Sequence, residues 1–173
     1  IQTGDFFGLD DIATEKPVVY NGWADVYGQW IKDYGISGFR VDTARHVDDA
    51  FFKNWSPQIN AAAKSVGIDN FTIFGEVWDV NPINLMNYVR RNKIQTVLDF
   101  PFQRTAAEFA AGYSDATVVE NLFAYDDLYT TATSDASNLV TFLGNHDMGR
   151  AAKIIESKRI NKASELLPRT LLG

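Results

Sequence analysis

The sequence predicts an α/β fold made of parallel β-α-β units, and three observations support this fold. Short apolar runs of strand length recur along the chain, and segments with helical periodicity lie between them. No internal repeat or linker interrupts the alternation, so we expect one domain. Three of the runs lead into a carboxylate, within the segments Gly38–His46, Phe74–Asp79 and Phe142–Asp147. Catalytic groups collect at the carboxyl ends of strands in barrels and open α/β sheets.

The predicted elements alternate in order along the chain. The first helix, Val18–Tyr34, carries apolar residues at spacings of three and four, and Gly35 is suited to end it. A second helix is expected at Asp49–Val66, kinked by Pro57 or restarted after Ser56. The remaining helices are expected from Asn81 to about Arg91 and at Thr105–Ala111, Thr117–Phe123 and Gly149–Arg159. The strands are expected at Gly38–Ala44, Phe71–Val77, Thr96–Phe100 and Leu139–Leu143.

Composition narrows the class of protein. The formal net charge of −6 argues against a nucleic-acid partner. No apolar run reaches the roughly 18 residues of a membrane-spanning helix, so no membrane partner is expected. The absence of cysteine excludes disulfides and thiolate metal sites, but it leaves export open.

Two carboxylates have neighbours that favour different protonation states. Asp42 follows Arg40 by two residues, and residues i and i+2 of a strand share one face. The guanidinium is expected to keep Asp42 ionised and oriented, as a nucleophile requires. Glu76 ends a mainly apolar segment, where burial and nearby negative charge favour the protonated form of a general acid. The alternatives are a structural ion pair for Asp42 and a basic partner in a loop for Glu76.

A histidine and an aspartate, His146 and Asp147, follow the last apolar run. The histidine can donate hydrogen bonds to sugar hydroxyls, and the aspartate can stabilise an oxocarbenium-like transition state. A lone pair of this kind is more often a turn or capping feature. Asp99, which ends the third run, is interpreted as structural. Three carboxylates gathered at one rim would suit glycoside hydrolysis.

The wording and order of Gly-Phe-Arg-Val-Asp, Gly-Glu-Val and Asn-His-Asp resemble the α-amylase family of retaining glycoside hydrolases. The resemblance implies a partial (β/α)8 TIM barrel, containing about strands four to seven with their helices. A complete barrel takes roughly 200 to 250 residues, so residues 1–173 are interpreted as an internal fragment. Residues 1–15 would be a return segment from an inserted domain, and residues 16–173 would be barrel units. We expect this fragment alone to be inactive.

The resemblance also implies roles for particular residues. Asp42 would be the nucleophile, Glu76 the general acid and base, and Asp147 the group that binds substrate and stabilises the transition state. Residues implied in substrate binding are Arg40, Arg45, His46, His146 and Trp78. Two of them have structural alternatives to substrate binding, because His46 can be an ordinary residue at a helix start and Trp78 can be a packing residue. Arg45 stands where many members have lysine, which changes the donor geometry.

A structural calcium ion is implied by the segment Phe7–Asp11, which is similar to a family segment that holds one. Asp11 and the backbone carbonyl of His46 would be ligands, since calcium prefers oxygen. Asp10 replaces a frequent family proline, and a solvated pair of aspartates is the alternative. The other ligands would lie upstream of Ile1, so the site in this fragment would be incomplete.

The function implied for the parent protein is retaining endo-hydrolysis of α-1,4-glucosidic bonds in starch-like glucans or maltooligosaccharides. A transglycosylase or an α-glucosidase of the same family is the alternative among enzymes, because loops decide between these activities. A non-catalytic glycan-binding or scaffold homologue is the alternative outside enzymes, and the presence of Asp42, Glu76 and Asp147 disfavours it. The resemblance implies a secreted or periplasmic protein, and the sequence leaves the oligomeric state undetermined.

Overall fold

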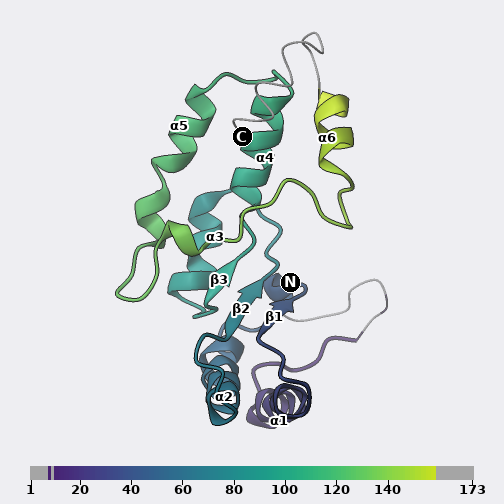
Figure 1. Cartoon of the computed structure of the whole chain (residues 1–173), viewed down its shortest axis with the longest axis vertical. Coiled ribbons are helices and arrows are strands. Elements are labelled where there is room, and N and C mark those ends of the chain that lie inside the picture. Colours follow the sequence, from purple (N-terminus) through teal and green to yellow (C-terminus); the bar gives the residue numbers. More distant parts are fainter. Residues whose placement is uncertain (1–7, 9, 159–173) are drawn as a thin grey trace. The chain divides into compact units, whose positions relative to one another are not determined.

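The computed structural model describes residue 8 and residues 10–158, which form parts of two compact units. The first unit comprises Ile1–Trp78 and Asn87–Val97, and the second comprises Asp79–Met86 and Leu98–Gly173. Each unit is described by itself below, and Figure 1 gives the order of their elements along the chain.

The first unit contains a parallel three-stranded sheet with the order β1-β2-β3. The strands are β1 (Gly38–Val41), β2 (Thr72–Gly75) and β3 (Thr96–Val97). Val41 pairs with Gly75, so the carboxyl ends of β1 and β2 lie level at one edge of the sheet. The residues that follow these two strands are therefore neighbours, as parallel β-α-β units require.

Two helices pack side by side in the first unit, α1 (Pro17–Tyr34) and α2 (Phe51–Ser65) (Figure 1). Their close approach occurs at Gly28, where an added Cβ would meet the Cβ of Ala62 at 3.4 Å. Gly35 ends α1 in the left-handed conformation, as the sequence predicts. The second helix does not restart after Ser56, which was one of the two expected effects of Pro57, because α2 continues through Pro57 as one helix.

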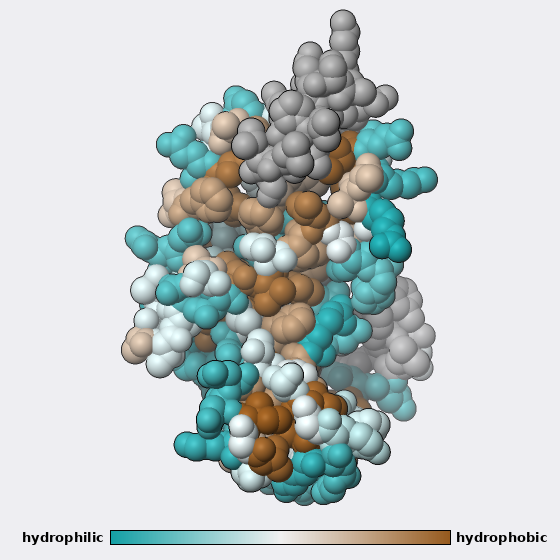
Figure 2. Space-filling model, viewed as in Figure 1, coloured by the Kyte–Doolittle hydropathy of each residue, from teal (hydrophilic) through white to brown (hydrophobic). Residues whose placement is uncertain are grey.

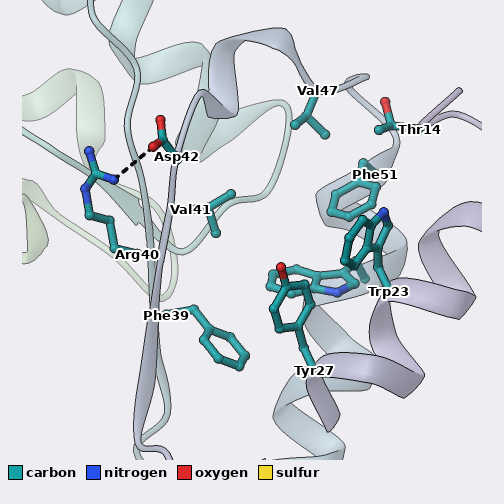
Figure 3. Close-up of a pocket in the computed structure, with 10 residues that line it drawn as sticks. Thr14, Trp23, Tyr27, Phe39, Arg40, Val41, Asp42, Val47 and Phe51 are labelled. Atoms are coloured by element: carbon teal, nitrogen blue, oxygen red, sulfur yellow. Dashed lines mark ion pairs between the residues drawn. The ribbon is translucent and has the colours of Figure 1, made fainter. Parts of the chain in front are cut away.

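Aromatic rings join these helices to one face of β1. Phe39 of β1 packs against Tyr27 of α1 at 5.3 Å between ring centroids, against Trp55 of α2 at 6.1 Å and against Phe71 at 5.1 Å. Figure 3 shows Phe39 and Val41 on the side of β1 that faces Tyr27, around a pocket of about 320 Å³. Hydrophobic surface also remains over α1 and α2, in the lower part of Figure 2. These rings cover one face of β1. Arg40, which lies between Phe39 and Val41, is therefore on the opposite face.

The second unit is mainly helical. Its helices are α4 (Phe100–Ala110), α5 (Thr117–Phe123) and α6 (Ala151–Lys158), and it has 3-10 turns η2 (Asp126–Tyr129) and η3 (Ala136–Asn138). The helix α3 (Pro82–Arg90) has its first residues in this unit and its last in the first unit. The expected helix Thr117–Phe123 is confirmed, and Arg159, the expected end of the last helix, lies outside the described residues.

Two expected strands differ from the structure. The third ends at Val97 rather than Phe100, because Asp99 caps α4 by accepting a hydrogen bond from the Phe102 amide at 2.9 Å. The expected strand Leu139–Leu143 forms only one parallel bridge, between Val140 and Leu98. The side chain of Gln103 instead donates to the Leu143 carbonyl at 3.2 Å, so a side chain takes the place of a neighbouring strand there.

Candidate active site

Arg40 and Asp42 lie on the face of β1 opposite to the aromatic cluster. Figure 3 shows both side chains directed away from Phe39 and Val41. An Arg40 Nη1 to Asp42 Oδ2 distance of 3.5 Å makes them an ion pair. The expectation that residues two apart on this strand meet on one face is confirmed.

Glu76 comes directly after β2, and its amide donates to the Val41 carbonyl at 2.8 Å, which continues the strand pairing by one residue. Its side chain is only 8% exposed, and Arg40 Nη2 lies 3.3 Å from Glu76 Oε2. One guanidinium thus contacts both Asp42 and Glu76. Each of the two carboxyl groups also shifts the pKa of the other.

These contacts push the two carboxyl groups toward opposite protonation states. The hydrogen-bond interaction with Glu76 is the largest effect on Asp42 and lowers its pKa. Burial opposes this effect, and the charge of Arg40 then lowers the pKa further, so that it lies below the ordinary value. Burial, followed by the hydrogen bond to Asp42, raises the pKa of Glu76. The pair therefore holds one proton on Glu76 while Asp42 is ionised, which suits a general acid beside a nucleophile.

A third contact to Glu76 comes from a residue that the sequence did not indicate. The backbone amide of Thr43 donates to Glu76 Oε2 at 3.3 Å. Thr43 has φ 46° and ψ 35°, in the left-handed region that β-branched residues rarely adopt. No signal in the sequence marks this conformation, because glycine and asparagine are the residues that usually adopt it.

The predicted binding residues Arg45, His46 and Trp78 also lie in the first unit. Arg45 and His46 belong to the 3-10 turn η1 (Ala44–His46), which follows Thr43. Arg45 Nη1 donates to the Trp78 carbonyl at 3.0 Å, so the loop after β1 is tied to the loop after β2. Trp78 is 46% exposed, which leaves its ring accessible for contact with a ligand. Asp42, at 63% side-chain exposure, is likewise accessible.

His146 and Asp147 belong to the second unit, in a loop between Leu143 and α6. His146 Nε2 lies 3.2 Å from Asp147 Oδ2. Asn145 holds the loop, because its Oδ1 accepts from the Asp147 amide at 2.9 Å and from the Met148 amide at 3.1 Å. A Cβ on Gly144 would lie 2.5 Å from the Gly149 carbonyl oxygen, so the turn needs glycine there.

The expected calcium ligands are Asp11, which is exposed, and the carbonyl of His46. Calcium takes six to eight oxygens, and no cluster of three or more acidic or histidine side chains occurs among residue 8 and residues 10–158. Phe7 and Leu9 of the same segment lie outside the described residues.

Comparison with known proteins identifies the family. Residues 3–172 match the family model "Alpha amylase, catalytic domain", and the chain belongs to this family. It is 41% identical to an alpha-amylase of Streptomyces lividans over 88% of its own length, and 29% identical to a cyclomaltodextrin glucanotransferase of Klebsiella oxytoca over 91%. These matches span 17% and 25% of the two relatives.

A solved structure agrees with this assignment. The alpha-amylase of Geobacillus thermoleovorans, complexed with acarbose, is similar with a TM-score of 0.76 and 28% identity. The match covers 92% of this chain and 34% of that enzyme. The chain thus has an α/β fold that forms part of the family's catalytic domain, and the family's barrel extends beyond these residues. Within the described residues, no helix is long and apolar enough to cross a membrane.

Proposed function

We propose that the protein containing this chain hydrolyses internal α-1,4-glucosidic bonds of starch-like glucans with retention of configuration. The contact of one guanidinium with both Asp42 and Glu76 carries this proposal. It places an exposed carboxylate with a lowered pKa beside a buried carboxyl group with a raised pKa. Retaining glycosidases require these two states at neighbouring positions.

In the first step, the Glu76 carboxyl group gives its proton to the glycosidic oxygen while an Asp42 oxygen attacks the anomeric carbon. The bond from that carbon to the leaving oxygen breaks, and a glycosyl ester forms on Asp42. In the second step, the Glu76 carboxylate takes a proton from water, whose oxygen attacks the same carbon. The ester breaks, the sugar leaves with its original configuration, and Asp42 and protonated Glu76 are regenerated.

The contact of Arg40 with both carboxyl groups, at 3.5 Å and 3.3 Å, keeps Asp42 and Glu76 close together and supports retention rather than inversion. Inverting enzymes keep their carboxyl groups roughly 6.5 to 9.5 Å apart to hold a water between them. The roles proposed for Asp147 and His146, which are substrate binding and transition-state stabilisation, rest on the family resemblance. Arg45, His46 and Trp78 are proposed to contact sugar at the loops after β1 and β2.

Transglycosylation is a second candidate, favoured by the 29% identity to a cyclomaltodextrin glucanotransferase. Both reactions share the glycosyl ester on Asp42 and differ in the second step, where a sugar hydroxyl replaces water. The ratio of transfer to hydrolysis products, measured with maltooligosaccharides as donor and acceptor, separates them.

Three further features are proposed, which concern the order of the strands, a calcium site and the location of the protein. The strands β1, β2 and β3 are proposed to be strands four to six of the barrel, with Leu139–Leu143 in the position of the seventh. A calcium site that includes Asp11 and the His46 carbonyl is also proposed. The Asp48 amide donates to Thr14 Oγ1 at 2.9 Å, which joins the segment after Asp11 to the segment after His46 and supports this proposal. Chelation with EDTA should then lower the melting temperature of the full-length protein, and added calcium should restore it. Finally, we propose that the protein is secreted or periplasmic, where polymeric glucan is available.

The proposed function is tested with soluble starch and full-length protein. Asp42→Asn, Glu76→Gln and Asp147→Asn should each lower turnover by about 10³-fold or more, without loss of folding. Proton NMR of the earliest products should show the α-anomer before mutarotation. Initial β-anomer, or near-native turnover in any of the three variants, would contradict the proposal.

A further inference from the structure

We propose that Thr43 is a positioning residue, whose backbone amide holds the Glu76 carboxylate at the moment when Glu76 has given up its proton. The proposal rests on the function proposed above and deepens it. It stands on three observations about one peptide unit, which are its contact with Glu76, its left-handed conformation and its fixed neighbours on both sides.

The contact is directed at the oxygen that also meets Arg40. Glu76 Oε2 accepts from the Thr43 amide at 3.3 Å and lies 3.3 Å from Arg40 Nη2. Donors on a carboxylate strengthen when it becomes negative, since a charged acceptor makes a stronger hydrogen bond. The amide therefore stabilises the product of proton transfer from Glu76 more than the reactant, which is the requirement for catalysis by electrostatic preorganisation.

The conformation sets the direction of the chain that follows this amide. With the Thr43 N–H in contact with Glu76, a right-handed or extended Thr43 would send Ala44 and η1 in a different direction. The Thr43 side chain makes no capping hydrogen bond to η1, so the hydroxyl does not account for the left-handed backbone. The rare conformation for a β-branched residue is thus imposed by its surroundings, as occurs at functional sites.

The surroundings that impose it lie on both sides, and on the N-terminal side the Val41 carbonyl accepts from the Glu76 amide at 2.8 Å. The Thr43 carbonyl accepts from the His46 amide at 2.8 Å, which fixes the C-terminal side. The next residue, Ala44, is fully buried, and a Cβ on Gly75 would lie 2.9 Å from the Cβ of Ala44. The segment after β1 is therefore clamped against the end of β2, where Glu76 begins.

The charged groups that act on Glu76 within the first unit come from the end of β1. Arg40 and Asp42 are these groups, and the Thr43 amide opposes burial by lowering the pKa of Glu76. The strand β3, on the other side of β2, presents the uncharged residues Thr96 and Val97. The other arginine of this region, Arg45, donates to the Trp78 carbonyl. The Thr43 amide is therefore expected to lower the pKa of Glu76, with no charged residue of β3 acting on the same carboxyl group.

The direct test is a pH titration of full-length protein labelled with ¹⁵N-threonine. The chemical shift of the Thr43 amide proton should move downfield as Glu76 ionises. The midpoint of this change should fall at the same pH as the alkaline limb of kcat, and the change should vanish in Glu76→Gln. Thr117 is a matched control, because its amide donates to an Asp115 carboxylate at 2.9 Å in the second unit. Its titration should follow Asp115 and persist in Glu76→Gln. A Thr43 amide that stays flat across the alkaline limb would overturn the proposal.

A second test removes the amide by replacing residue 43 with the corresponding α-hydroxy acid, which changes the peptide N–H to an ester oxygen. The alkaline limb of the pH profile should move to higher pH, and kcat should fall about tenfold. The same ester at Thr117 should leave the limb in place. A limb that does not move in the ester at position 43 would also overturn the proposal. If the ester variant does not fold, the titration of the unmodified protein still decides.

The outcomes separate this proposal from the proposed function. A Thr43 amide that follows Glu76 in a protein without glucan hydrolysis would contradict the function and leave the positioning contact established. Hydrolysis with a flat Thr43 amide would contradict the positioning role alone.

Discussion

Arg45 donates a hydrogen bond from Nη1 to the backbone carbonyl of Trp78 at 3.0 Å, across 33 residues of sequence. The two residues come from the loops after β1 and β2, which also carry Asp42 and Glu76. The contact uses the backbone of Trp78, and the residue is 46% exposed. A side chain expected to bind substrate directly thus also holds the loop of a second binding residue.

Replacing Arg45 should therefore impair binding more than chemistry. In Arg45→Ala, KM for maltooligosaccharides should rise about fivefold, because a hydrogen bond of about 1 kcal/mol is lost, while kcat changes little. Arg104→Ala is the matched control, since Arg104 pairs with Glu108 on the exposed side of α4 in the second unit. A loss confined to kcat, or an equal effect of Arg104→Ala, would argue against the role of Arg45.

Gly75 should resist replacement even by alanine. An added Cβ would lie 2.5 Å from Ile94 Cδ1 and 2.9 Å from Ala44 Cβ, so the end of β2 has to move. Overpacking of this kind costs about 1–3 kcal/mol of unfolding free energy, and the movement displaces Glu76 as well. Gly75→Ala should therefore lower both the melting temperature and kcat.

The control for this substitution is Gly22→Ala, in the middle of α1, where a Cβ meets nothing within 4 Å. This variant should gain up to about 1 kcal/mol, because alanine favours helix over glycine. If Gly75→Ala were as stable and active as the unmodified protein, the close packing of β2 against η1 would be wrong.

The pH profile of starch hydrolysis should be bell-shaped. Activity needs ionised Asp42, whose lowered pKa moves the acid limb below the ordinary aspartate value. It also needs protonated Glu76, whose raised pKa moves the alkaline limb above the ordinary glutamate value. The two shifts widen the active range in both directions. A kcat/KM profile measured across both limbs checks this prediction. The prediction would be contradicted by an active pH range narrower than the range expected for an aspartate and a glutamate with ordinary pKa values.

Asp99 should destabilise the fold at neutral pH. Burial and the nearby Asp126 raise its pKa, although the Phe102 amide donates to it. A raised pKa in the folded state means that the protonated acid is favoured there, so its contribution is best at low pH and falls as pH rises through the folded pKa. Asp99→Asn keeps a capping oxygen and cannot ionise. Its melting temperature should exceed that of the unmodified protein at neutral pH and converge with it in acid.

Asp135 is a control of opposite sign. It caps η3, and the Ser137 hydroxyl and amide lower its pKa. Its stabilising effect is present above the ordinary pKa and is lost as pH falls through the folded pKa. Asp135→Asn should therefore be less stable than the unmodified protein at neutral pH and equal to it in acid. The same sign for both variants would contradict the assignment of Asp99.

Local rules predicted much of the first unit. The extent of α1 and the shared face of Arg40 and Asp42 follow from periodicity, and the end of α1 follows from the preference for glycine at helix ends. The contact of Arg40 with Glu76 needed the register of β1 on β2, which the sequence does not specify.

The failures have physical reasons as well. The strand expected at Thr96–Phe100 overlaps a helix start, because Asp99 caps α4 and Pro101 stands in its first turn. The run Leu139–Leu143 is apolar enough for a strand, but a strand needs a continuous backbone partner, and Val140 alone is bridged. The left-handed Thr43 could not be predicted, because threonine carries no preference for that conformation.

Identification of the nucleophile tests the central claim most directly. Full-length protein is incubated with a 5-fluoro-α-glycosyl fluoride, which slows hydrolysis of a glycosyl ester, and its peptides are then analysed by mass spectrometry. The account predicts one sugar on the peptide that contains Asp42, at the Asp42 side chain, and no label in Asp42→Asn. A sugar on Glu76, or release of fluoride with no covalent label under conditions that trap such esters, would contradict it.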